Sequence, residues 1–250
     1  VLRGEDHVSN TATQIQMFAA LGAALPQFAH MALLTGSEGK LSKRLGTIGI
    51  SDFRAAGIEP MAINALLARL GTSDPVEPAI DMAPLIERFA FAHFGGAPAR
   101  FSDEELEGLN RKIVHLLPYE AVADRLPAAI GPAIWPILQP NLATVAEAAD
   151  WLPILTGEIA VPTLGEDDRA YLAQAADVAA QADFAADPWH ALTSALKDAT
   201  GRKGKALFLP LRVALTGMDH GPDMAALLPV IGQDRALARL RAAAASPAPA

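Results

Sequence analysis

The chain has 250 residues, of which 51% are hydrophobic and 19% charged, so it can bury one large core or two modest ones. It contains no cysteine, which excludes disulfides and Cys-ligated zinc or iron–sulfur sites, and no apolar run reaches the roughly 18–20 residues that cross a bilayer. Its net charge of −8 disfavours a broad nucleic-acid-binding surface but permits a local basic one.

The opening stretch, VLRGEDH, predicts the end of a strand followed by a functional loop. Because the chain starts without Met, we expect a C-terminal piece of a longer protein, with a processed complete protein as the alternative. Thr11 and Gln14 match a capping box at the start of a helix that ends at Gly22. The short apolar segment 28–34 predicts a buried strand ending at Thr35.

Proline and glycine mark the next elements. Pro60 suits the first turn of a helix through MAINALLARL, and Gly71 stands where a left-handed residue ends such a helix. Residues 72–84 hold three prolines and predict a junction. We therefore expect one domain over 1–75 and a second over 76–250, with a further division into about 76–155 and 156–250 as an option.

A long helix is predicted after residue 101. Ser102 and Glu105 form a capping box at its start. The apolar residues that follow at helical spacing are Leu106, Leu109, Ile113 and Leu116. They predict one buried face.

The last quarter of the chain is also helical by pattern. Asp187 and Pro188 suit an N-cap and first helical position, and the helix they start should end at Gly201. Its apolar face is formed by Trp189, Leu192 and Leu196. Two more helices are predicted, one after Pro222 through Leu228 and one over 234–245, before a disordered SPAPA tail. The fold class is therefore mainly α.

A glycine- and lysine-rich stretch, TGSEGKLSKRLG (35–46), predicts a phosphate-binding loop. Only Ser37 and Glu38 separate Gly36 from Gly39, so the spacing excludes a P-loop. The KLSKR part (40–44) suits a charge developing on a transferring phosphate, because each ammonium can follow a moving group. A solvated charge run is the alternative. RGEDH lies about one strand and one helix upstream, so the two loops can meet at one end of a sheet.

Together these segments resemble the bacterial glutamyl-tRNA synthetase family, a group of class I aminoacyl-tRNA synthetases. The resemblance is carried by RGEDHVSNTATQIQ (3–16) and KLSKR, and it extends through 51–71 and 201–232. It implies the residual end of a Rossmann-type catalytic sheet with a helical stem-contact region, followed by an all-α anticodon-binding domain.

The resemblance also implies roles for single residues. Arg3 matches the position that contacts the glutamate substrate, where a guanidinium fork pairs bidentately with a carboxylate. Lys43 is the expected catalytic residue, stabilising charge as pyrophosphate leaves. The ATP-binding positions are Asp6, Leu34 (with Leu33 as the alternative), Lys40, Leu41, Ser42, Lys43 and Arg44. His7 is a candidate for lining the ATP site or for a structural role.

The family's HIGH signature, which precedes KLSKR in chain order, is missing from this sequence. We therefore expect no amino-acid activation from the chain alone. The helical remainder should contact tRNA through Arg111, Lys112, Arg202, Lys203 and Lys205. Trp135, Trp151 and Trp189 are candidates for stacking on bases, with core positions as the alternative.

The resemblance implies a glutamate–tRNA ligase whose partners are tRNA(Glu), glutamate and ATP, with Mg²⁺ arriving on the nucleotide and no metal site on the chain. We expect a cytoplasmic monomer without membrane contact. One alternative is a free-standing tRNA- or RNA-binding module without catalysis. Another is an all-α interaction protein with no RNA role.

Overall fold

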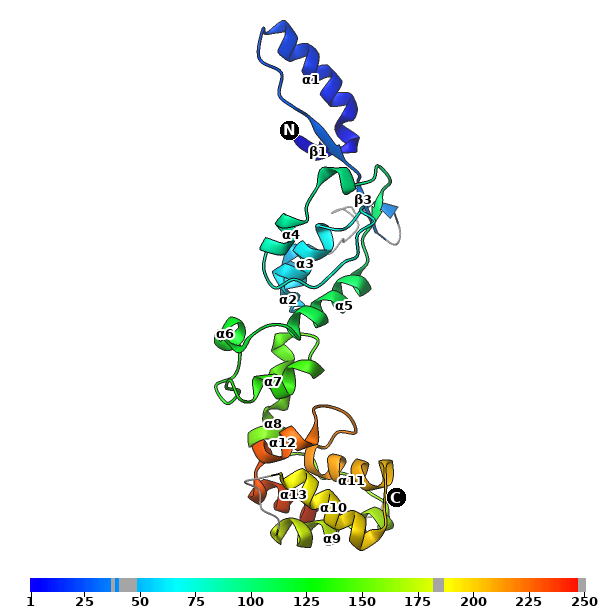
Figure 1. Cartoon of the computed structure of the whole chain (residues 1–250), viewed down its shortest axis with the longest axis vertical. Coiled ribbons are helices and arrows are strands. Elements are labelled where there is room, and N and C mark those ends of the chain that lie inside the picture. Colours follow the sequence, from blue (N-terminus) through cyan, green and yellow to red (C-terminus); the bar gives the residue numbers. More distant parts are fainter. Residues whose placement is uncertain (37–38, 41–48, 182–186, 247–250) are drawn as a thin grey trace. The chain divides into compact units, whose positions relative to one another are not determined.

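The computed structural model describes residues 1–36, 39–40, 49–181 and 187–246. It divides into two compact units, Val1–Leu117 and Pro118–Ala250. Helices dominate both units (Figure 1), which confirms the mainly α prediction. Sheets are confined to short strands in the first unit, within the residues described.

The first unit contains every strand and five of the helices described. Its strands are β1 (Leu2–Gly4), β2 (Ala29–Met31), β3 (Leu34–Gly36), β4 (Gly39–Lys40) and β5 (Ala99–Arg100). Its helices are α1 (Val8–Ala20), α2 (Ile50–Ala55), α3 (Pro60–Leu67), α4 (Ala83–Glu87) and α5 (Asp103–Val114). Single 3-10 turns lie at Glu5–His7 and Phe91–His93.

The predicted strand over 28–34 is wrong as a single buried element. β2 pairs in parallel with β1, whereas β3 pairs in parallel with β5 and antiparallel with β4. The chain changes sheet at Leu33, whose carbonyl accepts a hydrogen bond from the Ala99 N–H at 3.1 Å. Neither strand is buried, because each has one exposed and two half-buried residues.

The predicted capping box at Thr11 is also wrong. α1 already begins at Val8, so Thr11 lies inside the helix. Its hydroxyl donates to the His7 carbonyl at 3.0 Å instead of capping a free N–H. The helix does end near Gly22 as predicted, and Gly22 has a positive φ of 62°.

α3 and α5 form the core of the rest of this unit. α3 begins at Pro60 as predicted, and Gly71 has a φ of 88° just beyond it. Ser102 caps α5 by accepting the Glu105 N–H at 3.3 Å, which confirms the N-cap part of the second predicted capping box. Leu106, Leu109 and Ile113 are buried, but Leu116 is 52% exposed because the helix has ended before it.

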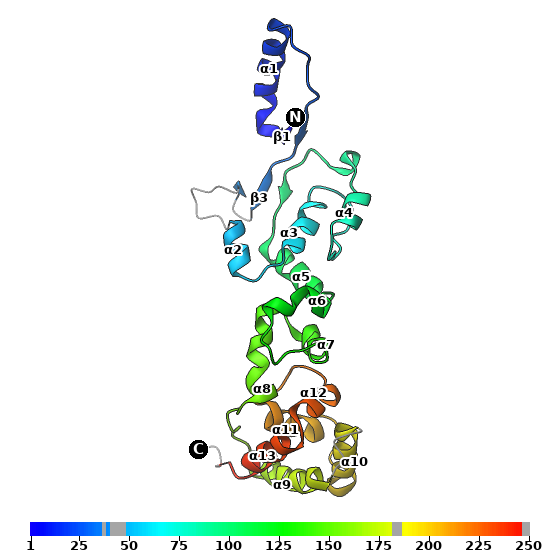
Figure 2. The ribbon, with the colours of Figure 1, turned by 90° about the vertical axis from the view of Figure 1, so that its left-hand side faces the viewer.

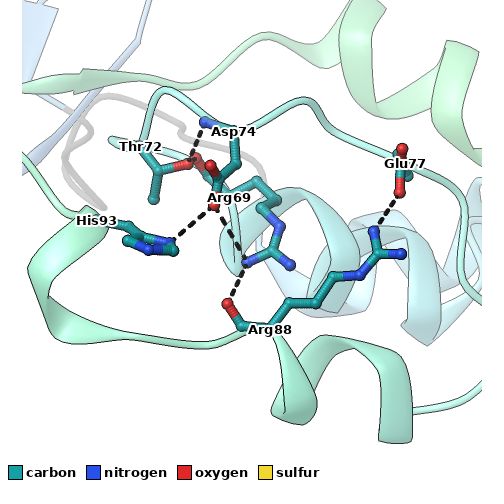
Figure 3. A network of polar contacts seen from close by, with 6 residues as sticks. All are labelled: Arg69, Thr72, Asp74, Glu77, Arg88 and His93. Carbon is teal, nitrogen blue, oxygen red and sulfur yellow. Dashed lines mark hydrogen bonds and ion pairs between the residues drawn. The ribbon is translucent and has the colours of Figure 1, made fainter.

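The proline-rich segment 72–84 packs into the first unit. Asp74 contacts the His93 ring at 3.0 Å and lies 4.0 Å from Arg69, and Glu77 pairs with Arg88 at 2.7 Å (Figure 3). These contacts tie the segment to α3 and to the turn after α4. The segment belongs to the unit Val1–Leu117, and the boundary expected after residue 75 stays a prediction.

The second unit is entirely helical among its described residues. Its helices are α6 (Tyr119–Val122), α7 (Trp135–Leu138), α8 (Leu152–Thr156), α9 (Glu166–Gln181), α10 (Pro188–Thr200), α11 (Lys205–Thr216), α12 (Met224–Ile231) and α13 (Gln233–Ala244). Short 3-10 helices cover Ala123–Arg125, Gln139–Asn141 and Val145–Trp151. α9 and α13 lie side by side in both views (Figures 1 and 2).

The predicted ends of the later helices are largely confirmed. Asp187 caps α10 by accepting the His190 N–H at 3.0 Å, and Gly201 ends the helix with a φ of 69°. The predicted helix after Pro222 runs three residues further than expected, to Ile231. Ser246 is 4% exposed and its carbonyl accepts from Arg169, so this first residue of the predicted tail is packed.

Candidate functional site

The first predicted site residue, Arg3, lies in the middle of β1. Its Nη2 donates to Gln14 Oε1 at 2.7 Å, and its guanidinium lies 5.3 Å from the centre of the Phe28 ring. Its Nε is shut off from solvent, and no described residue is hydrogen-bonded to it. A carboxylate therefore has to approach Arg3 through the two terminal nitrogens.

A second polar pair lies beside Arg3. Arg3 and His30 are in register across β1 and β2, so their side chains point to the same face of the sheet. His30 Nε2 lies 2.8 Å from the hydroxyl of Thr11, the one buried residue of α1. That hydroxyl already donates to the His7 carbonyl, so it accepts from His30, which fixes a proton on Nε2.

The turn after β1 holds Asp6 and His7. A Cβ added to Gly4 would lie 2.5 Å from Asp6 Oδ1, so the glycine lets the carboxylate lie over the backbone. Asp6 is exposed, as expected of a ligand-binding carboxylate. The His7 ring lies 3.2 Å from Asn10 Nδ2 and is also exposed.

Only part of the expected ATP-binding set lies in the described structure. Leu34 begins β3 and is 36% exposed. Lys40 ends β4, in backbone register with Thr35. Leu41, Ser42, Lys43 and Arg44 lie outside the described residues. The structure places Arg3 in β1, Asp6 in the turn that follows it and Leu34 at the start of β3, and the expected convergence of Arg3 with Lys43 stays a prediction.

The expected tRNA contacts fall into two groups. Arg111 and Lys112 are exposed in the last turn of α5. Lys203 and Lys205 are exposed around the start of α11 in the other unit. Phe208, one turn into α11, is 44% exposed and its ring lies 6.0 Å from that of Trp189. Cations and aromatic rings at a helix start are the groups that bind single-stranded RNA.

Arg202 differs from these exposed cations. It pairs with Asp168 at 2.6 Å and lies 4.3 Å above the Tyr171 ring. It also donates to the backbone carbonyls of Asp167 and Ala206. Burial raises the pKa of Tyr171 to about 12, although the positive charge of Arg202 acts in the opposite direction and lowers this pKa. Most of the guanidinium is thus engaged in holding the loop before α11 to α9.

The three tryptophans also differ in their exposure to solvent. Trp135 and Trp151 are 1% and 7% exposed, so they are core residues. Trp189 is half-buried and keeps a ring contact with exposed Phe208. Only Trp189 among the three retains a surface suited to stacking.

The sequence analysis missed Gln14 and His30 as members of the site and misassigned Thr11. The available signal was the spacing of Thr11, Gln14 and Phe18, which places all three on one face of a helix. All three are buried or half-buried in α1.

Another hollow in the first unit carries no predicted site residue. It measures about 440 Å³ and is lined by Arg69, Asp74, Arg88, Phe89 and His93 among others. Several of its charged groups already have partners, since Asp74 lies against Arg69 and His93, and Arg88 pairs with Glu77. Across the described part of the chain, no three His, Cys, Asp or Glu side chains are grouped to hold a metal.

Two protein-family models match this chain and identify the class of protein to which it belongs. Residues 1–107 match the catalytic domain of tRNA synthetases class I (E and Q), and residues 111–244 match the anticodon binding domain. The chain therefore belongs to the family of class I tRNA synthetases of the glutamate and glutamine type. The order of the two domains is the order predicted from the sequence.

Among curated proteins, the chain is similar to glutamate–tRNA ligases. Glutamate–tRNA ligase 1 of Novosphingobium aromaticivorans is 64% identical over 242 residues, which cover 97% of this chain and 55% of the relative. Glutamate–tRNA ligase 2 of Sphingopyxis alaskensis is 64% identical over 247 residues, covering 98% and 56%. The predicted resemblance to glutamyl-tRNA synthetases is confirmed. The chain spans about half the length of the curated relatives it matches.

A solved structure agrees on the fold. The glutamate tRNA ligase from Elizabethkingia meningosepticum superposes with a TM-score of 0.77 at 22% identity, over 98% of this chain and 56% of that one. At this identity the likeness supports the fold alone. Within the described residues, no helix combines the length and apolarity needed to cross a membrane.

Proposed function

We propose that this chain is the C-terminal part of an enzyme that activates glutamate with ATP and transfers it to tRNA(Glu). The observation that carries the proposal is the order of two matched domains, catalytic then anticodon-binding, with Arg3 in β1 of the first. The chain supplies the KLSKR loop and the tRNA-binding helices, and it is inactive alone.

Arg3 is the residue we assign to glutamate. Its terminal nitrogens offer a forked set of donors that match a carboxylate, and Phe28 covers one face of the guanidinium. Gln14 engages one donor without adding a charge that would repel the substrate. This arrangement supports selection of an acidic amino acid over a neutral one.

ATP is assigned to the neighbouring loops. Asp6 lies in the turn after β1, Leu34 begins β3, Lys40 ends β4, and residues 41–44 come next in the sequence. Lys43 is assigned the role of stabilising negative charge on the leaving pyrophosphate. Mg²⁺ is expected to arrive with the phosphates of the nucleotide.

Exposed cations are assigned to tRNA. Arg111 and Lys112 on α5, and Lys203 and Lys205 beside α11, are available to phosphates. Arg202 is assigned to supporting the loop that carries Lys203. The enzyme is expected to act in the cytoplasm as a monomer.

The experiment joins this chain to the additional N-terminal part of the Novosphingobium relative and measures glutamate attachment to tRNA. We expect charging by the joined protein, tRNA binding but no charging by the chain alone, and a sharply raised glutamate KM in Arg3→Lys. No glutamate charging by the joined protein would refute the enzyme. Near-normal glutamate use by Arg3→Lys would remove Arg3 from the substrate site.

Salt dependence tests the RNA-binding part separately. Each phosphate contact to a single strand contributes about 0.7 to the slope of log affinity against log salt. We therefore expect tRNA affinity of the chain to fall steeply as salt rises. Absence of binding at low salt would refute tRNA contact and leave an interaction protein.

A further inference from the structure

The face of α1 that covers β1 and β2 carries two hydrogen bonds to side chains of those strands. Thr11 contacts His30 at 2.8 Å, and Gln14 contacts Arg3 at 2.7 Å. Thr11 and Gln14 are three residues apart, so they lie one above the other on the helix. Arg3 and His30 are directly opposite each other in the sheet. Thr11 and Gln14 are thus each hydrogen-bonded to one of the two paired strand residues, His30 and Arg3.

The two contacts differ in how much of the strand side chain, His30 or Arg3, can still bind another group. His30 is tied to a hydroxyl that is itself tied to the His7 carbonyl, so this contact anchors the helix to β2. Arg3 is tied through one nitrogen only. The Arg3 Nε is closed to solvent, and Phe28 lies on one face of the guanidinium. The hydrogen bond to Gln14 therefore sets the orientation of the remaining edge of the Arg3 guanidinium.

From this geometry we propose that Gln14 is a positioning residue, which turns Arg3 toward the substrate carboxylate and so sets the preference for glutamate. The inference rests on the proposed function. A neutral amide suits this role because it accepts a hydrogen bond from Arg3 without cancelling its charge. A carboxylate at position 14 would form a charge-assisted pair with Arg3 and compete with the substrate.

Kinetics in the joined, full-length protein test the proposal. Gln14→Met removes the acceptor at similar length, and Gln14→Glu adds the competing charge. The matched control is Gln16→Met, since Gln16 is exposed on the same helix. We expect Gln14→Met to raise the glutamate KM about 10-fold, the effect of one hydrogen bond to a charged group, while the ATP KM stays within about twofold. Gln14→Glu should raise the glutamate KM further, and Gln16→Met should match wild type.

A second measurement does not depend on activity. In this chain, NMR of the Arg3 guanidinium should show slow rotation about the Cζ–Nε bond, and Gln14→Met should speed it whereas Gln16→Met should not. Unchanged rotation and an unchanged glutamate KM in Gln14→Met would overturn the proposal. Equal rises in the glutamate and ATP KM values would also overturn it, because they indicate a structural role. If wild type fails to charge glutamate, the proposed function fails instead, whatever the rotation shows.

Discussion

Arg239 is a buried cation whose removal should destabilise the second unit strongly. It lies in α13, is 8% exposed, and donates to three backbone carbonyls: Leu215 at 2.8 Å, Pro153 at 3.0 Å and Gly157 at 2.9 Å. Leu215 lies in the last turn of α11 and Gly157 directly follows α8, where helix carbonyls lack donors of their own and carry the negative end of the helix dipole, whereas Pro153 lies in the first turn of α8.

The size of the effect follows from these three bonds. Burial lowers the pKa of the Arg239 guanidinium, and nearby Arg235 lowers it further, but an arginine remains charged at neutral pH. Replacing it with Met removes a charged donor and leaves two carbonyls without a partner, since Pro153 still accepts from the Gly157 N–H. We expect a loss of about 2–6 kcal/mol, at about 1–3 kcal/mol for each carbonyl left unsatisfied, out of the roughly 5–15 kcal/mol that stabilise a typical protein.

The assay is urea unfolding followed by tryptophan fluorescence. All three tryptophans lie in the second unit, so the signal reports its unfolding alone. With a slope of about 2 kcal/mol per molar urea, Arg239→Met should shift the midpoint down by about 2 M. Arg241→Met, an exposed position on the same helix, should shift it little. Equal midpoints for the two variants would refute the capping role of Arg239.

Three further predictions concern catalysis, pH and packing. In the joined enzyme, Lys43→Ala should lower the rate of glutamate activation, measured by pyrophosphate exchange, and leave tRNA affinity nearly unchanged; a large loss of tRNA binding would mean that the loop is misassigned. Because burial raises the pKa of Tyr171 to about 12, unfolding releases a proton above pH 10, so the free energy of unfolding should fall between pH 10 and 12. Tyr171→Phe should remove that part of the fall, and an identical fall in both proteins would contradict the assignment. Gly221→Ala should destabilise the second unit, because φ is +128° and the added Cβ would lie 2.5 Å from the Trp151 ring, whereas Gly131→Ala meets no atom within 4 Å; similar melting temperatures for the two variants would count against this close contact.

Local signals were read from the sequence more reliably than contacts between elements. Ser102 and Asp187 cap helices as predicted because a cap depends on residues three positions apart. Thr11 has the same sequence pattern, but its hydroxyl is hydrogen-bonded to His30, nineteen residues away. No local pattern encodes that contact. The short strands 29–31 and 34–36 are separate because their partners are β1 in one case and β5 in the other.

The roles of the candidate site residues stay predictions. Arg3, Asp6 and Leu34 were identified through a motif, and they lie in β1, in the turn after β1 and at the start of β3. Gln14 was read only as half of a capping box, although its contact is with Arg3. Arg202 looked like Lys203 in sequence, yet only Arg202 has an acidic partner, Asp168, which lies 34 residues earlier. The charge of a basic cluster can be read from a sequence, but its ion pairs require the fold.

Asn110, almost fully buried at 1% exposed, has a consequence for RNA recognition. Its side chain accepts the Glu59 N–H at 2.8 Å and donates to the Gly57 carbonyl at 3.4 Å, which locks α5 to the start of α3. Arg111 and Lys112 follow it directly, so their backbone is already immobilised before any phosphate arrives. Docking there would require freezing side-chain rotamers only, and the entropy lost on association should be correspondingly small.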